Sequence, residues 1–151
     1  MRYKTVGEVI EEDKAFHAQL AKQYGEFEQL VADERIELLL DQLHRREEAM
    51  AQTLDNLLHD VHPGALRTWV QFAPEGREPE FLQRLRNLSL QDLDEIARLA
   101  MDIEVYLADH YRDLLQDAQT PSAKDTFQRL LELGRLDEHT LSMNLFNLRD
   151  Y

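Results

Sequence analysis

Four acidic residues interrupt otherwise apolar faces of predicted helices, and they are the strongest chemical signal in this sequence. They are Asp13, Glu47, Glu104 and Asp137. Each falls where the three- and four-residue spacing of apolar side chains calls for another apolar residue. A carboxylate buried in such a position is costly unless it is protonated, paired with a cation or bound to a metal ion. If the helices pack together, these acids predict a carboxylate cluster of the kind that binds divalent cations.

The elements that must position these acids are four long helices. They are expected at about 5–29, 33–59, 89–117 and 121–149. Short links within each pair predict two antiparallel hairpins. Asp13 and Glu47 are 34 residues apart, and Glu104 and Asp137 are 33 residues apart. This matched spacing places both pairs near the middle of their hairpins, so the sequence predicts an all-α bundle with the four acids in one layer.

The segment 60–88 between the two hairpins has a different composition. It contains three of the four prolines and a short aromatic stretch, TWVQFAP. We expect an extended crossover with a short helix at 79–86. A crossover this long is explained if it runs the length of the bundle, so that the third helix starts at the same end as the second. Trp69 and Phe72 are expected to anchor the crossover in the core.

The composition narrows the classes of protein and of partner. A chain of 151 residues is expected to form a single domain spanning residues 1–151. The net charge of −13 disfavours nucleic acid as a partner, because such a surface repels phosphates. The sequence has no cysteine, no apolar run long enough for a membrane span and no apolar signal segment at its start, so a soluble cytoplasmic protein is expected.

The order of these features resembles the ferritin-like superfamily, in particular rubrerythrin and bacterioferritin. The resemblance covers nearly the whole chain: two helix hairpins, a long crossover and one acid near the middle of each helix. It implies a left-handed four-helix bundle. It also implies a di-iron site with Glu on helices one and three and Glu-x-x-His on helices two and four.

The chain departs from that pattern at both histidines. Helix two has Glu47-Glu48-Ala49-Met50, and helix four has Asp137-Glu138-His139-Thr140. Met50 and Thr140 therefore occupy the histidine positions, and a thioether or a hydroxyl is a weak ligand for iron. His17 follows Asp13 by one helical turn and is the first histidine that a shifted metal site would use. If no metal is bound, Arg45 or Arg46 could hold a buried acid by an ion pair, although arginines in such positions more often form exposed pairs within their own helix.

These observations favour a ferritin-like bundle whose carboxylate site is degenerate, either non-catalytic or weakly binding to a divalent metal such as Fe or Mn. No other cofactor is expected. One alternative is a di-metal oxidase or peroxidase with an altered ligand set, Asp13, Glu47, Glu104, Asp137 and His17. Another is an acidic module that binds a basic protein partner.

Apolar residues outside the main helix faces also predict a homo-oligomer, most simply a dimer. These surplus apolar residues are Leu38, Leu39, Leu99, Val105 and Tyr106.

Overall fold

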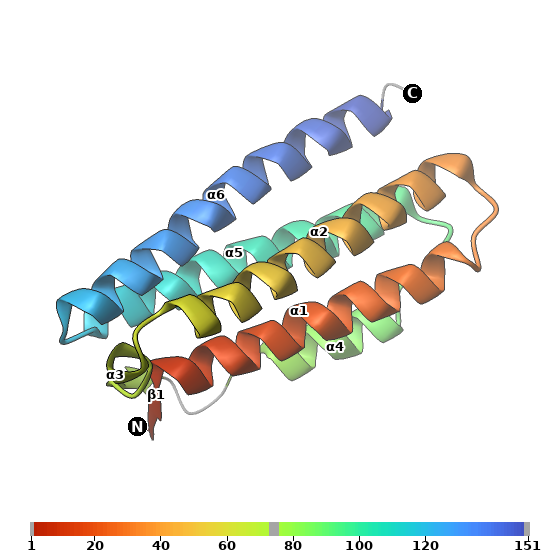
Figure 1. Ribbon diagram of the computed structural model, residues 1–151. Helices are drawn as coiled ribbons and strands as arrows, with labels where there is room; N and C mark the ends of the chain where they lie inside the picture. The colour runs from red at the N-terminus through yellow and green to blue at the C-terminus, as the bar shows by residue number, and fades with distance from the viewer. Residues whose placement is uncertain (1, 73–75, 150–151) are drawn as a thin grey trace.

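The computed structural model describes residues 2–72 and 76–149, and it is mostly helical (Figure 1). In order, the elements are β1 Arg2–Thr5, α1 Val6–Glu28, α2 Glu34–Asp60, α3 Pro63–Leu66, β2 Trp69–Phe72, α4 Glu78–Arg86, α5 Leu93–Asp117 and α6 Pro121–Arg149. The four expected long helices are α1, α2, α5 and α6, which confirms the all-α class. Only α5 differs clearly from its expected bounds, since it begins at Leu93 rather than at residue 89.

Local hydrogen bonds explain where the long helices begin. Thr5 and Glu8 form a capping box at the start of α1, in which the Thr5 hydroxyl accepts a hydrogen bond of 3.1 Å from the Glu8 N–H. At the start of α2, the Asp33 side chain accepts hydrogen bonds from the N–H groups of Arg35 and Ile36. Asp92 rather than Ser89 caps α5, because the residues just before Asp92 form a turn.

The crossover contains a short strand, β2, within the segment that the sequence predicted to be extended. β2 pairs with β1 in an antiparallel ribbon that places Trp69 opposite Thr5. Successive side chains of a strand point to opposite sides, and here Val70 is buried while Trp69 is 61% exposed. The prediction that Trp69 anchors the core is therefore wrong. The Phe72 side chain, which shared that prediction, lies outside the described part of the structure.

The short helix expected at 79–86 is α4, and it attaches the crossover to the bundle. Phe81 and Leu85 are buried on its inner side. Arg84 on α4 forms an ion pair of 2.9 Å with Asp102 on α5. Because α4 runs back along the long axis, α5 starts at the same end as α2 and follows the same direction (Figure 1).

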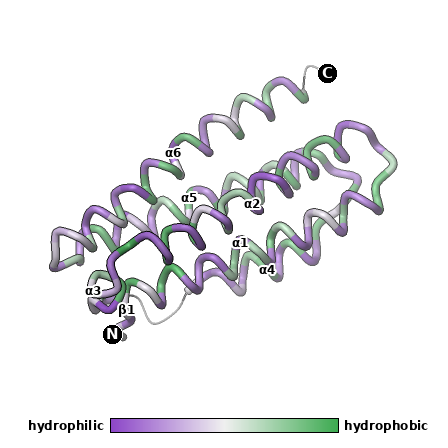
Figure 2. Tube along the Cα trace, viewed as in Figure 1, coloured by the Kyte–Doolittle hydropathy of each residue, from purple (hydrophilic) through white to green (hydrophobic). Residues whose placement is uncertain are grey.

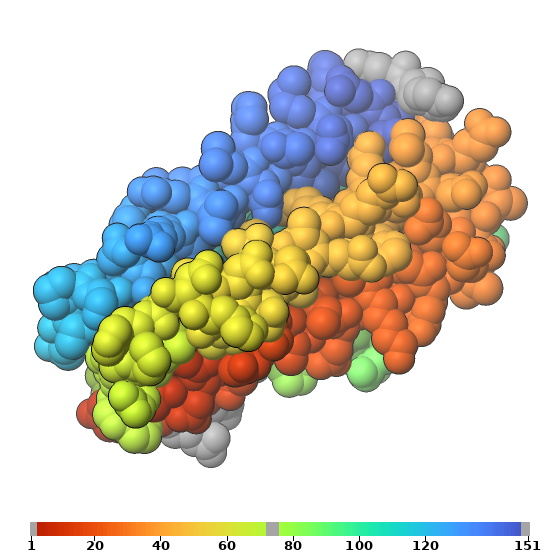
Figure 3. All heavy atoms as spheres, viewed as in Figure 1, coloured from red at the N-terminus to blue at the C-terminus, as the bar shows by residue number. Residues whose placement is uncertain are grey.

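The long helices lie side by side along one axis (Figure 2). Their buried apolar residues form one core. On the face drawn in Figure 3, the atoms of α2 lie between those of α1 and α6. Leu39 and Leu99 belong to this core, so their expected role in association is wrong, whereas Leu38 and Val105 are exposed. Tyr106 is partly buried against the core. Within the described ranges, each helix is too short or too polar to cross a bilayer.

Candidate functional site

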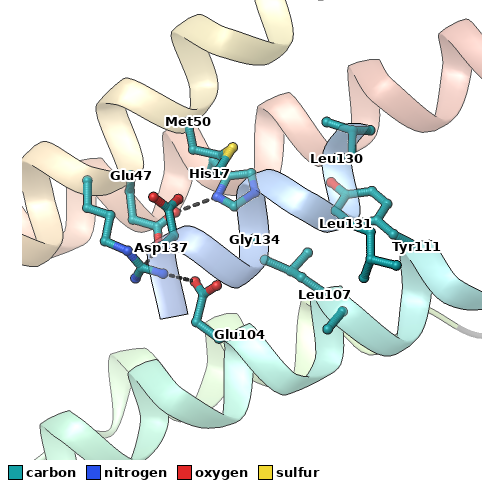
Figure 4. Close-up of a pocket in the computed structure, with 12 residues that line it drawn as sticks. His17, Glu47, Met50, Glu104, Leu107, Tyr111, Leu130, Leu131, Gly134 and Asp137 are labelled. Atoms are coloured by element: carbon teal, nitrogen blue, oxygen red, sulfur yellow. Dashed lines mark hydrogen bonds and ion pairs between the residues drawn. The ribbon is translucent and has the colours of Figure 1, made fainter. Parts of the chain in front are cut away.

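Five polar side chains from four helices meet in the middle of the bundle, and we call them the polar centre. They are His17 from α1, Arg46 and Glu47 from α2, Glu104 from α5 and Asp137 from α6. Figure 4 shows Glu47, Glu104 and Asp137 pointing toward one another, with His17 beside Glu47. Three of the four acids predicted to converge therefore line one site.

Arg46 is the positively charged residue that lies between the carboxylates of this site. One guanidinium nitrogen lies 2.5 Å from a carboxylate oxygen of Glu104, and another lies 4.0 Å from Glu47. The side chain is largely buried, so the pair with Glu104 joins α2 to α5 away from bulk water. Arg45, the other candidate partner named from the sequence, is exposed and pairs with Asp41 on its own helix. The sequence-based expectation of an arginine partner holds for Arg46 alone of these two.

His17 is the second cationic group, and it pairs with Glu47. The Nδ1 atom of His17 forms a short buried contact with a carboxylate oxygen of Glu47, which ties α1 to α2. Burial acts to lower the pKa of His17, but the Glu47 carboxylate more than offsets this and raises the pKa above its ordinary value. His17 was expected to work with Asp13, and the structure gives it a different acid.

Burial opposes the ionisation of the other two acids of the polar centre, Glu104 and Asp137. Burial raises the pKa of the Glu104 carboxyl to about 7, although Arg46 acts in the opposite direction. Burial also raises the pKa of Asp137. When Arg46 and His17 are both positive they balance Glu47 and Glu104, so ionising Asp137 would leave an uncompensated negative charge. The positive and negative charges of the polar centre can therefore balance one another without a metal ion.

A small cavity of about 20 Å³ adjoins the polar centre. Its other wall is apolar and includes Met50, Leu107 and Leu131 (Figure 4). That volume holds about one water molecule. Arg46 Nε, in a residue that lines this cavity, has no hydrogen-bond partner among the described residues.

Asp13 is buried but belongs to a second group, between α1, α4 and α5. Its partner is Glu78 at the start of α4; we call Asp13 and Glu78 the carboxyl pair. Burial first, and then Asp13 beside it, raises the pKa of Glu78 to about 9, which favours the protonated form of Glu78 at neutral pH. His110 Nε2 lies 3.3 Å from an Asp13 oxygen, and burial together with the nearby Asp13 raises the pKa of Tyr111.

The expected single layer of four acids is therefore divided into two adjacent groups. Glu78 was missed from the sequence because it lies in the crossover, where no periodic pattern marks a buried residue. Its one sequence signal is its place just before Pro79, since proline favours the first turn of a helix.

The polar centre does not fit the di-iron set implied by the resemblance. Within the described ranges, no group of three or more His, Asp or Glu side chains is arranged to hold a metal ion. Met50 does line the cavity, as the predicted histidine position should. Thr140, however, is exposed, so the predicted position on helix four is in the wrong register. Arg46 occupies the space among the carboxylates where a cation would bind.

Comparisons with protein-family models, with curated proteins and with solved structures found no match to this chain. The function is therefore inferred from the geometry of the site.

Proposed function

We propose that this chain is a ferritin-like helical bundle in which a buried arginine replaces the metal centre, and that it functions without catalysis as a structural or binding protein. The observation that carries the proposal is the position of Arg46 against Glu104 and Glu47. The order of the hairpins and the crossover along the bundle supports the ferritin-like part of the proposal.

The balance of charge between Arg46 and the carboxylates supports this proposal. A guanidinium among carboxylates already supplies the positive charge that a divalent cation would bring. A metal ion could enter only by displacing Arg46 into a mostly apolar interior, where its charge would lose its partner. The acids then serve to join α2 and α5 rather than to bind a reactive ion.

The test compares wild type with Arg46→Gln and with the neighbouring control Arg45→Gln. Each protein is exposed to Fe²⁺ or Mn²⁺ without oxygen, desalted and analysed for bound metal, and Mn²⁺ binding is measured by calorimetry. We expect no stoichiometric metal in wild type or in Arg45→Gln, because Arg46 still neutralises the acids. Arg46→Gln frees Glu47 and Glu104 and is expected to gain Mn²⁺ binding.

Stoichiometric iron in the wild type, followed by rapid oxidation when oxygen is admitted, would overturn the proposal in favour of the di-metal oxidase. Should Arg46→Gln not fold, the double variant Arg46→Met with Glu104→Gln removes both charges and keeps Glu47, His17 and Asp137 available. Circular dichroism on every variant shows whether the helices are retained.

A further inference from the structure

The outer side of α6 carries exposed apolar side chains, which we call the outer stripe. They are Leu133, Leu136, Met143 and Phe146. Leu136 is 67% exposed and Phe146 is 63% exposed. α6 lies at one edge of the molecule, and no described segment packs over its outer side (Figure 1). Large apolar side chains gathered on one exposed helix face are typical of an interaction surface.

The charge around the outer stripe suits contact with a second copy of this chain. Residues 139–148, HTLSMNLFNL, contain no Asp, Glu, Lys or Arg, although the chain as a whole has a net charge of −13. Two copies with that charge repel each other over most of their surfaces. The half of the outer stripe that contains Met143 and Phe146 lies in this uncharged segment, so it adds no repulsion to a contact between two copies.

The spacing of the outer stripe is also symmetric about a point between His139 and Thr140. Leu136 and Met143 are equally far from this point along the chain, and Leu133 and Phe146 are equally far from it as well. With 3.6 residues per turn, Leu136 and Met143 lie about 10° to opposite sides of the centre of the stripe. By the same geometry, Leu133 and Phe146 lie about 70° to opposite sides.

A two-fold axis perpendicular to α6 at this point exchanges the two halves of the stripe. Such an axis brings each residue before the midpoint to the same level as the residue equally far after the midpoint in the second copy. Leu136 then lies level with Met143 of the second copy near the centre of the contact, and Leu133 lies level with Phe146 at its edges. A self-complementary patch of this kind is what a two-fold homodimer requires.

We propose that the chain forms an antiparallel homodimer through the outer stripe of α6, with the two-fold axis passing between His139 and Thr140. The interface lies on the opposite side of α6 from the polar centre, so the inference goes beyond the proposed function and does not depend on it. The dimer that the sequence predicted was assigned to other residues, of which Leu38 and Val105 are exposed but lie outside this stripe.

The first test measures mass in solution by sedimentation velocity at micromolar concentrations. We expect a dimer for the wild type and a monomer for the double variant Leu136→Glu with Met143→Glu, because four acidic groups would meet at the axis. The control is Val105→Glu, which adds a charge at an exposed apolar residue of α5 and is expected to stay dimeric. A monomeric wild type, or a dimer that survives the double variant, would refute the interface.

The second test fixes the orientation of the two copies and needs no destabilising change. Because the chain has no cysteine, single spin labels can be attached through Thr140→Cys or Arg129→Cys, both at exposed residues of α6. In the antiparallel dimer, labels at 140 approach to roughly the distance between two packed helices, about 10 Å plus the length of the labels. Labels at 129 are separated by about 32 Å along the axis.

A parallel dimer would instead give short distances at both positions, and association through another surface would give a long distance at 140. Either result contradicts the proposal. Binding to an unrelated protein in place of self-association would appear as a monomer in both experiments, and it would contradict the proposal equally.

Discussion

The guanidinium of Arg46 lies 2.5 Å from the carboxylate of Glu104, and this buried pair joins the first hairpin to the second. Arg46 is on α2 and Glu104 is on α5, two helices that are separated in the chain by the whole crossover. Together with the pair between His17 and Glu47, it links three of the four long helices through charge. The stability of the bundle should therefore depend on these polar groups as well as on the apolar core.

Removing one member of the Arg46–Glu104 pair should cost much more than removing both. Arg46→Met leaves a buried carboxylate without its partner, and we expect the free energy of unfolding to fall by about 3–5 kcal/mol. The double variant Arg46→Met with Glu104→Leu should recover most of this loss, because no unpaired charge remains. Urea denaturation of the single and double variants measures both effects.

The matched control for this experiment is Arg45→Met. Its pair with Asp41 is on the surface, so it should change the free energy of unfolding by less than about 1 kcal/mol. If Arg46→Met proves no more harmful than Arg45→Met, the buried pair contributes little and its assigned role is wrong.

Stability should fall as the pH rises from about 4.5 to about 9, because the folded state holds protons that the unfolded chain releases. Burial raises the pKa of Glu104 to about 7 and that of Glu78 to about 9, from ordinary values near 4.5. The folded state therefore binds more protons across this range, and the free energy of unfolding decreases with pH. The raised pKa of His17 acts in the same direction, since its stabilising protonated form is lost as the pH increases.

Glu78→Gln isolates the carboxyl pair within this pH dependence. A glutamine can still donate a hydrogen bond to Asp13, but it has no proton to lose. We expect a shallower decline of the free energy of unfolding between pH 7 and 9, measured by urea denaturation at a series of pH values. Glu80→Gln on the same helix is the control, because Glu80 is exposed and pairs with Arg77. Equal slopes for the two variants would show that the carboxyl pair does not titrate as inferred.

Helix periodicity predicted the long helices and the burial of Glu47 and Glu104, because one apolar face per helix leaves little freedom in which side turns inward. On α6 the same periodicity placed Asp137 in the site, where it does lie. Thr140 was assigned instead from the motif spacing implied by the family resemblance, and it is exposed. The pairing of Asp13 with Glu78 could not be predicted either, because it depends on how α4 docks and not on any local spacing.

Gly134 offers a way to stabilise the bundle. A methyl group at this residue, which lines the cavity beside the polar centre, would have no neighbouring atom within 4 Å. Gly134→Ala should raise the free energy of unfolding by up to about 1 kcal/mol, since alanine is the better helix former. The control is Gly25→Ala in α1, where the added carbon would lie 3.0 Å from the His44 ring. Thermal unfolding should show a gain for Gly134→Ala and none for Gly25→Ala.

An iron site in this bundle should require the removal of Arg46. Introducing the histidine pattern of the ferritin-like superfamily through Met50→His, Thr140→His and Asp137→Glu should give no iron binding, because Arg46 remains among the acids and residue 140 is exposed. Met50→His with Arg46→Gln is expected to succeed where that triple variant fails. It removes the guanidinium and adds a second imidazole to a cavity already lined by His17 and the acids of the polar centre. Metal analysis and Fe²⁺ oxidation on both variants decide the matter. Iron bound by the triple variant would show that Arg46 moves aside readily, and the replacement of the metal centre by arginine would then be wrong.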